Sequence, residues 1–174
     1  MRRLRVVPVL AVMAVGLVLM TSCSSSKKSS DASTTTTAGA GVSVTTGAAG
    51  TTVNVTVSDT KGLDGPMTLT TDPKSAPAGT VTFVVKNTGT IDHEAVLLKL
   101  AAGQDPAKLE VATSGADIDK VSEDTNMGET GDPNVKPGET RTFTVTDLAA
   151  GNYILVCNIA KHYAMGMWAP FTVT

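Results

Sequence analysis

A thiol, an imidazole and two thioethers follow one another within eleven residues near the C-terminal end of the chain. Cys157 is followed by His162, and then by Met165 and Met167, at the end of an apolar, β-rich run. One thiolate, two imidazoles and a weak axial thioether are the ligands of blue copper, because soft sulfur suits Cu(I) and imidazole also suits copper. This stretch therefore contains every ligand of such a site except one imidazole.

The chain has only two histidines, so the second imidazole of such a site must come from His93. His93 lies where the polar segment 87–92 passes into the apolar run 95–98. A lone cysteine or methionine is more often a packing residue than a ligand. A free thiol in an oxidising compartment, however, is a liability unless it is paired, modified or bound to metal. The joint occurrence of these side chains therefore favours a metal site.

The two segments resemble the ligand segments of the cupredoxins, the small blue copper proteins. In that family an Asn-x-Gly turn, here Asn87-Thr88-Gly89, leads to the first histidine, and a Cys-x4-His-x4-Met loop provides the other ligands. The motif His-Tyr-Ala-Met-Gly-Met most resembles the corresponding segment of rusticyanin and the sulfocyanins. The resemblance to the family covers about residues 52–174. It implies an all-β, antiparallel Greek-key β-sandwich, to which the residues of this chain add an irregular, short-helical insertion. It also implies one copper ion per chain, cycling between Cu(I) and Cu(II), held by His93, Cys157, His162 and Met167.

Either of two methionines can provide the axial thioether. Met167 gives the His-x4-Met spacing of rusticyanin-like proteins, and Met165 gives the His-x2-Met spacing of the dinuclear copper domain of terminal oxidases. The dinuclear site needs two cysteines in the loop, and the loop has only Cys157. We therefore favour Met167 and keep Met165 as the alternative axial ligand. His162 is the expected electron port, and its uncharged flank is the expected partner-docking patch: Tyr163, Ala164 and Met165.

No acid, base or nucleophile constellation accompanies these ligands, and a Ser/His/Asp set would have to use one of them. Four protein ligands fill the site, whereas catalytic metal sites keep one position open. We therefore expect no catalytic residue and no enzyme, but a carrier of single electrons between protein redox partners. The alternative is a copper-binding protein of copper homeostasis or delivery. Met-rich or His-rich tracts would favour that alternative, and the sequence has none.

The first 22 residues are typical of a bacterial lipoprotein signal peptide. Three arginines precede the uncharged apolar run Val6–Met20, and two small residues lead to Cys23. The run has about fifteen residues, fewer than the roughly twenty that span a bilayer as a helix. We expect Cys23 to be lipidated, so that the protein is extracytoplasmic and anchored to the bacterial cell membrane. A secreted or periplasmic soluble protein is the alternative. Lipidation of Cys23 would leave Cys157 without an intramolecular partner.

Residues 23–50 consist almost entirely of Ser, Thr, Ala and Gly, a composition that buries too little apolar surface to fold. We interpret them as a flexible tether. Residues 51–174 have the size of one domain with a single core, the copper-binding domain. Without the signal peptide, 11 of the 14 basic residues remain against 16 acidic ones, so nothing indicates a nucleic-acid surface. We expect the domain to be a monomer.

Short alternating runs of β-branched and aromatic residues, bounded by Gly, Pro, Asp and Asn, recur along the domain and predict a sandwich. Alternation along the penultimate run places Tyr153, Leu155 and Cys157 on one face. The expected strands are Thr52–Ser58, Met67–Thr71, Gly79–Lys86, His93–Leu100, Glu139–Thr146, Gly151–Asn158 and Trp168–Thr174.

Residues 101–136 differ from this pattern and are interpreted as the insertion. Asp105 followed by Pro106 predicts a capped helix start. Eight acidic residues stand here against three lysines. Two interpretations remain open: a solvated excursion, or an acidic docking face that would steer a basic redox partner.

Overall fold

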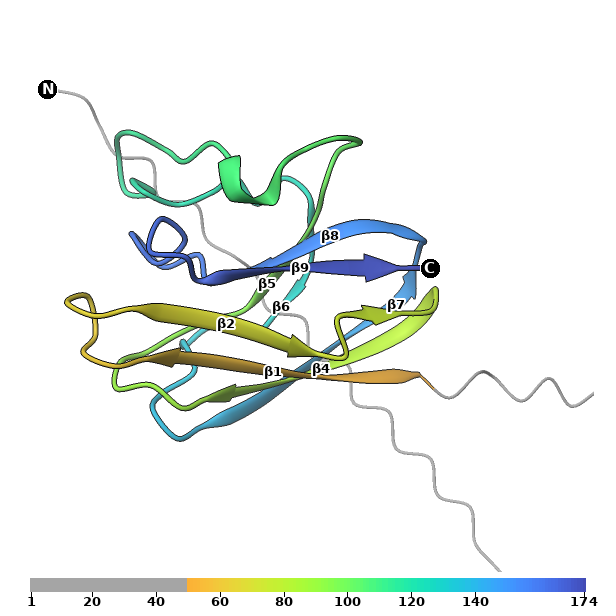
Figure 1. Ribbon diagram of the computed structural model, residues 1–174, viewed down its shortest axis with the longest axis horizontal. Helices are drawn as coiled ribbons and strands as arrows, with labels where there is room; N and C mark the ends of the chain where they lie inside the picture. The colour runs from red at the N-terminus through yellow and green to blue at the C-terminus, as the bar shows by residue number, and fades with distance from the viewer. Residues whose placement is uncertain (1–49) are drawn as a thin grey trace, which may run out of the picture. The chain divides into compact units, whose positions relative to one another are not determined.

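Strands form where the sequence alternates between apolar and polar residues. The computed structural model describes residues 50–174 (Figure 1). The expected signal peptide, Cys23 and all but the last residue of the expected tether lie outside the described residues. Within residues 50–174 the elements are β1 Thr51–Asp59, β2 Met67–Asp72, β3 Ser75–Ala76, β4 Gly79–Asn87, β5 Val96–Lys99, η1 Pro106–Lys108, β6 Asn126–Glu129, β7 Thr140–Leu148, β8 Gly151–Val156 and β9 Trp168–Val173.

Two sheets make up the fold, a four-stranded sheet in the order β2-β1-β4-β7 and a five-stranded sheet in the order β3-β9-β8-β5-β6 (Figure 1). The predicted all-β sandwich is confirmed. Most neighbouring strands are antiparallel, but β1 pairs with β4, and β3 with β9, in parallel. Between β2 and β4 the chain passes through β3, which belongs to the other sheet, and β4 then returns beside β1.

The core lies between the two sheets and is made by alternate residues of each strand. Phe83 of β4 stacks on Phe143 of β7 at a ring-centroid distance of 4.9 Å and meets the edge of Phe171 of β9 at 5.4 Å. Tyr153 and Leu155 of β8 enter the same core with Cys157, as the alternation predicts. The thiol therefore lies at the end of a rigid, apolar interior.

The insertion covers the outer face of the five-stranded sheet. Val121 packs there in a second buried cluster with Ile154 and Val156 of β8, and the partly buried Leu109 and Val111 pack against that cluster. The predicted helix start exists as the short 3-10 helix η1, in which the Asp105 carboxylate accepts a hydrogen bond from the Ala107 nitrogen. The insertion is therefore an apolar cover as well as an acidic segment.

Three local differences separate the structure from the sequence expectations. Strands β3 and β6 were not expected, because one has two residues and the other, Asn-Met-Gly-Glu, lacks an apolar alternation. Strand β5 begins at Val96 rather than at His93. His93 instead forms an isolated bridge with Val135. No helix in the described part of the chain has the length and hydropathy that crossing a bilayer requires.

Candidate metal centre

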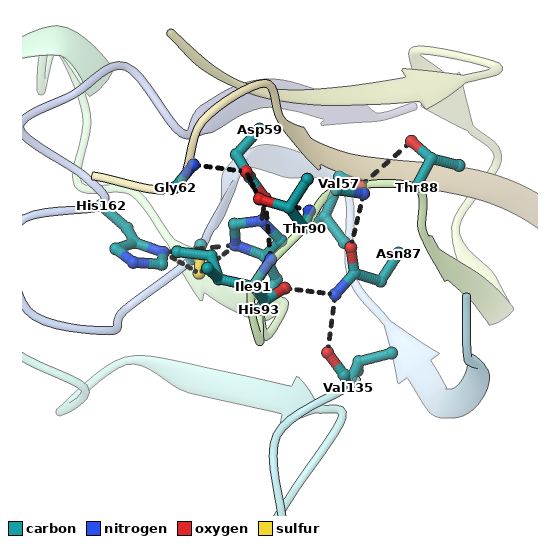
Figure 2. A network of polar contacts seen from close by, with 12 residues as sticks. Val57, Asp59, Gly62, Asn87, Thr88, Thr90, Ile91, His93, Val135 and His162 are labelled. Atoms are coloured by element: carbon teal, nitrogen blue, oxygen red, sulfur yellow. Dashed lines mark hydrogen bonds and ion pairs between the residues drawn. The ribbon is translucent and has the colours of Figure 1, made fainter. Parts of the chain in front are cut away.

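Three side chains from distant parts of the sequence converge at one end of the sandwich. The Nδ1 atoms of His93 and His162 are 3.3 Å apart, and the Cys157 Sγ atom is 3.2 Å from Nδ1 of His162 and 3.9 Å from Nδ1 of His93. Figure 2 shows the two imidazoles beside the sulfur atom. All three side chains are buried, and within residues 50–174 they are the one group of His, Cys or acidic donors close enough to share an ion.

The spacing of these donor atoms fits a trigonal metal site. Metal–nitrogen bonds of about 2.0 Å and metal–sulfur bonds of about 2.3 Å in one plane place neighbouring donors about 3.5–3.7 Å apart. The observed separations of 3.2, 3.3 and 3.9 Å lie around these values. One soft sulfur with two imidazoles is the donor set of a blue copper site. The residues present therefore fit copper.

Cys157 and His162 are placed by the short loop of residues 157–167 that joins β8 to β9, which we call the copper loop. The Cys157 nitrogen donates to the Met167 carbonyl at 3.0 Å, and the Met167 nitrogen donates to the His162 carbonyl at 3.1 Å. Lys161 at φ 74° and Gly166 at φ 90° adopt the left-handed backbone that this tight path requires. Met167 is fully buried, while Met165 is partly exposed. Met167, buried and bonded through its backbone to Cys157 and His162, is therefore the better placed of the two methionines to provide the axial thioether.

His93 is held by the Asn-x-Gly turn that precedes it. The Asn87 side chain donates to the carbonyls of Ile91 and Val135, at 2.8 Å each, and accepts from the Gly89 nitrogen at 2.8 Å. The backbones of His93 and Val135 exchange two further hydrogen bonds of 3.0 and 2.7 Å. Although His93 lies outside the regular strand, its backbone is therefore held by Val135, and the turn before it is held by the Asn87 side chain (Figure 2).

Asp59, at the end of β1, is a site residue that the sequence reasoning missed. Its Oδ1 atom lies 2.9 Å from Nε2 of His93, and its carboxylate also accepts hydrogen bonds from Gly62, Thr90 and Ile91. Burial acts to raise the pKa of Asp59, but the hydrogen bonds from Thr90, Gly62 and His93 outweigh it and hold the pKa below its usual range. The signal that could have identified Asp59 is the alternation along β1, because Asp59 continues the buried series of residues 53, 55 and 57.

Gly89 makes room for the contact between Asp59 and His93. A Cβ atom at position 89 would stand 2.1 Å from Oδ1 of Asp59, 2.7 Å from its backbone nitrogen and 3.0 Å from Nε2 of His93. These separations are below van der Waals contact, so a side chain there would displace the carboxylate or the imidazole. Position 89 therefore requires glycine because no side chain fits there.

The surroundings of Cys157 and His162 favour the uncharged forms of these two side chains when no metal is bound. Burial raises the pKa of the Cys157 thiol to about 12, against opposing hydrogen bonds from the backbones of Glu94 and Ile159. Burial, and then the neighbouring His93, lower the pKa of His162 to about 4. At neutral pH without metal the thiol is therefore protonated and the His162 imidazole is neutral.

An acidic cleft of about 660 Å³ is lined mainly by residues of the insertion, together with Glu94 and Asn158. Burial, and then the charge of Glu123, raise the pKa of Glu94 to about 7. The Glu94 backbone nitrogen also donates to Cys157 Sγ at 3.4 Å, so one residue of the cleft wall contacts the metal centre. The acidic residues that line it are Glu94, Glu110, Asp117, Glu123, Glu129 and Asp132.

The three residues of the expected docking patch differ in exposure. Ala164 is exposed and Met165 is partly exposed, but Tyr163 is only 6% exposed. The Tyr163 hydroxyl donates to the Pro106 carbonyl and accepts from the Leu109 nitrogen, at 2.8 Å each. Tyr163 therefore offers little surface to a partner and instead joins the copper loop to the insertion. His162 itself is 2% exposed.

The two-sheet sandwich and its buried Cys–His–His centre define a cupredoxin, a blue copper protein. The family model described as the sulfocyanin (SoxE) domain matches residues 52–174, so the chain belongs to the sulfocyanin family of cupredoxins. Its cofactor is one copper ion. Cupredoxins are extracytoplasmic proteins that transfer electrons to protein partners, and they are not enzymes.

Solved structures of blue copper proteins are similar to the chain. Reduced auracyanin from Roseiflexus castenholzii is 28% identical, with 72% of this chain and 98% of that one covered and a TM-score of 0.48. Auracyanin A from Chloroflexus aurantiacus is 22% identical over 71% and 99% of the two chains, with a TM-score of 0.46. Reduced rusticyanin is 25% identical over 72% and 81%, with a TM-score of 0.44. No curated protein matches the chain.

Proposed function

We propose that His93, Cys157 and His162 bind the copper ion through Nδ1, Sγ and Nδ1, with Met167 as the axial ligand. The convergence of the three buried donor atoms, none more than 3.9 Å from the next, carries this proposal. Bound copper supplies a one-electron couple between Cu(I) and Cu(II). The chain would then be an electron carrier whose site has no open position for a substrate.

The scaffold around the donors supports electron transfer over copper delivery. Cys157 follows a central strand, His93 is fixed through Asn87 and Val135, and the loop is closed by backbone hydrogen bonds. Such a framework leaves the ligands little freedom to move between oxidation states. A delivery protein has to release its ion, whereas here all three donors are buried.

We propose that electrons enter and leave at the His162 end of the domain. Ala164 and Met165 form the exposed part of the adjoining docking patch. Tyr163 bonds the loop to the insertion through the Pro106 carbonyl. Redox encounters use small interfaces, and a small uncharged patch fits that use. The acidic cleft is the second candidate surface, with a basic partner as its complement.

We further propose that the domain is a monomer held at the membrane by a lipid on Cys23 and by the tether of residues 23–50. The apolar run before Cys23 and the Ser/Thr/Ala/Gly composition of the tether support this arrangement. Mass spectrometry of the mature N-terminus tests it, and Cys23→Ala should release the protein from membranes. A mature protein without acyl mass would make it a secreted carrier.

Copper titration of the purified protein tests the central proposal. The wild-type chain should bind one copper ion and develop an intense blue absorption when oxidised. Cys157→Ala should lose that absorption while the far-ultraviolet circular dichroism of the sheets stays unchanged. Ser122→Ala, an exposed change outside the site, is a control that keeps the colour. A blue Cys157→Ala variant would overturn the ligand assignment.

A further inference from the structure

Asp59 is a buried carboxylate with an unusual set of partners. Its side chain is 0% exposed, and its two oxygens face donors from Gly62, Thr90, Ile91 and His93 (Figure 2). The donors from the first three are backbone N–H groups and a hydroxyl, so the hydrogen bonds suit an ionised carboxylate. Among the described residues its only ionisable partner is His93. No lysine or arginine of residues 50–174 forms an ion pair with it.

A buried charge is costly unless an opposite charge compensates it. A neutral imidazole does not provide that charge, whereas an imidazole bound to a cation does. Asp59 contacts Nε2 of the His93 ring. The other ring nitrogen, Nδ1, faces Cys157 and His162, where a bound cation would supply the opposite charge. The carboxylate, the ring and the proposed copper position form one chain of contacts.

We propose that Asp59 is the positioning and charge-balancing residue of the metal centre: it fixes the tautomer of His93 and stabilises the oxidised form. The inference rests on the proposed copper site. A neutral imidazole carries one ring proton, and an ionised carboxylate can only accept a hydrogen bond. The ring proton therefore stays on Nε2, and the lone pair of Nδ1 is directed at the metal.

The charge of Asp59 has a second effect. A fixed negative charge that is shielded from solvent attracts Cu(II) more strongly than Cu(I), because the interaction grows with the charge of the ion. Salt screens this attraction little, since the carboxylate has no contact with solvent. Asp59 therefore lowers the reduction potential of the centre. A backbone carbonyl in the same place would orient the ring without this charge.

Asp59→Asn in the full-length chain tests the proposal, because the amide oxygen can keep the contact with His93 while the charge is removed. Asp92→Asn is the matched control, since it removes the same charge from an exposed residue next to His93. Redox titration should give a higher potential for Asp59→Asn than for wild type, with a tenfold change in the ratio of Cu(II) to Cu(I) affinity equal to about 59 mV. Asp92→Asn should change the potential little. Equal potentials for the two variants would overturn the charge role.

A second measurement needs no variant and tests the positioning role even if Asp59→Asn does not fold. Nitrogen-15 NMR of the copper-free wild-type protein reports the tautomer of His93 directly. The proposal requires a proton on Nε2, and a ring that carries its proton on Nδ1 alone would overturn it. If the wild-type chain binds no copper, the proposed function fails, and the tautomer still reports on the contact between Asp59 and His93.

Discussion

The hydroxyl group of Tyr163 lies 2.8 Å from both the Leu109 nitrogen and the Pro106 carbonyl, so the copper loop is bonded to the insertion. Asn158 makes a similar pair of bonds, accepting from the Val121 nitrogen at 2.8 Å and donating to its carbonyl at 3.0 Å. Tyr163 follows His162 and Asn158 follows Cys157. Cys157 and His162 are therefore each followed by a residue that anchors the insertion.

Tyr163→Phe is expected to lower the free energy of unfolding of the copper-free protein by about 1–2 kcal/mol, because two partly buried backbone groups lose their partner. Urea denaturation measures the loss, and hydrogen exchange at the Leu109 amide should quicken. Tyr153→Phe is the matched control, since that hydroxyl bonds the Ala149 carbonyl at 2.7 Å, away from the insertion. Unchanged protection of Leu109 in Tyr163→Phe would contradict the anchoring role.

Met167→Leu is expected to change the visible spectrum and the reduction potential, because it removes the proposed axial thioether from a fully buried position. Met165→Leu is the control in the same loop and should leave both nearly unchanged, since Met165 is partly exposed. Absorption spectra and redox titrations of the two variants check this. A larger change for Met165→Leu would reassign the axial ligand.

Ala164→Glu is expected to slow electron exchange, because it places a charge on the exposed part of the docking patch. Electron self-exchange in mixed reduced and oxidised samples, followed by NMR line broadening, measures the effect. The absorption spectrum should not change, since Ala164 is no ligand. Ala150→Glu adds the same charge before β8, at the opposite end of that strand from Cys157. Equal exchange rates in the two variants would contradict the docking patch at Ala164 and leave the acidic cleft as the candidate docking surface.

Copper uptake at pH 7 is expected to release one proton from Cys157 and none from His162. Their pKa values of about 12 and about 4 make the thiol protonated and the imidazole neutral before binding. Copper binds the thiolate and the neutral imidazole, so the thiol proton makes the apparent affinity rise roughly tenfold per pH unit. Calorimetry in buffers of different ionisation enthalpy counts the protons. Cys157→Ala should release one fewer per copper bound, and the same number would contradict this assignment.

Glu94 is expected to make the copper-free protein less stable as the pH rises. Its pKa is raised from 4.5 to about 7, so the folded chain holds this proton more tightly than the unfolded chain does. The destabilisation is therefore absent below about pH 4.5, grows between pH 4.5 and 7, and is constant above pH 7. Urea denaturation from pH 4 to 8 measures it. Glu94→Gln should flatten the decline, and an equally steep decline in that variant would exclude Glu94 as its source.

Much of the framework follows from the sequence, because alternation fixes which side chains enter the core. The series Tyr153, Leu155 and Cys157 predicted the position of the thiol, and the two histidines left no choice for the imidazoles. Strand β6 could not be predicted in this way. Its residues pair with β5 at the edge of the sheet and are mostly exposed, so no apolar pattern marks them.

The supporting contacts could not be predicted, because they join segments far apart in the sequence. Asp59 stands 34 positions before His93, and only the folded backbone brings the carboxylate to the ring. Tyr163 was expected at the surface because its neighbours are uncharged loop residues. The structure buries its ring because the insertion returns over the loop and offers backbone partners to the hydroxyl.

Gly89 limits which sequences can keep this centre. The space beside Oδ1 of Asp59 holds a hydrogen atom and no methyl group, so an aspartate at position 59 and a side chain at position 89 exclude each other. A relative with alanine at position 89 must have lost the carboxylate or moved its histidine. The two positions should therefore vary together, and a pairwise count across related sequences would reveal which copper proteins share the buried acid.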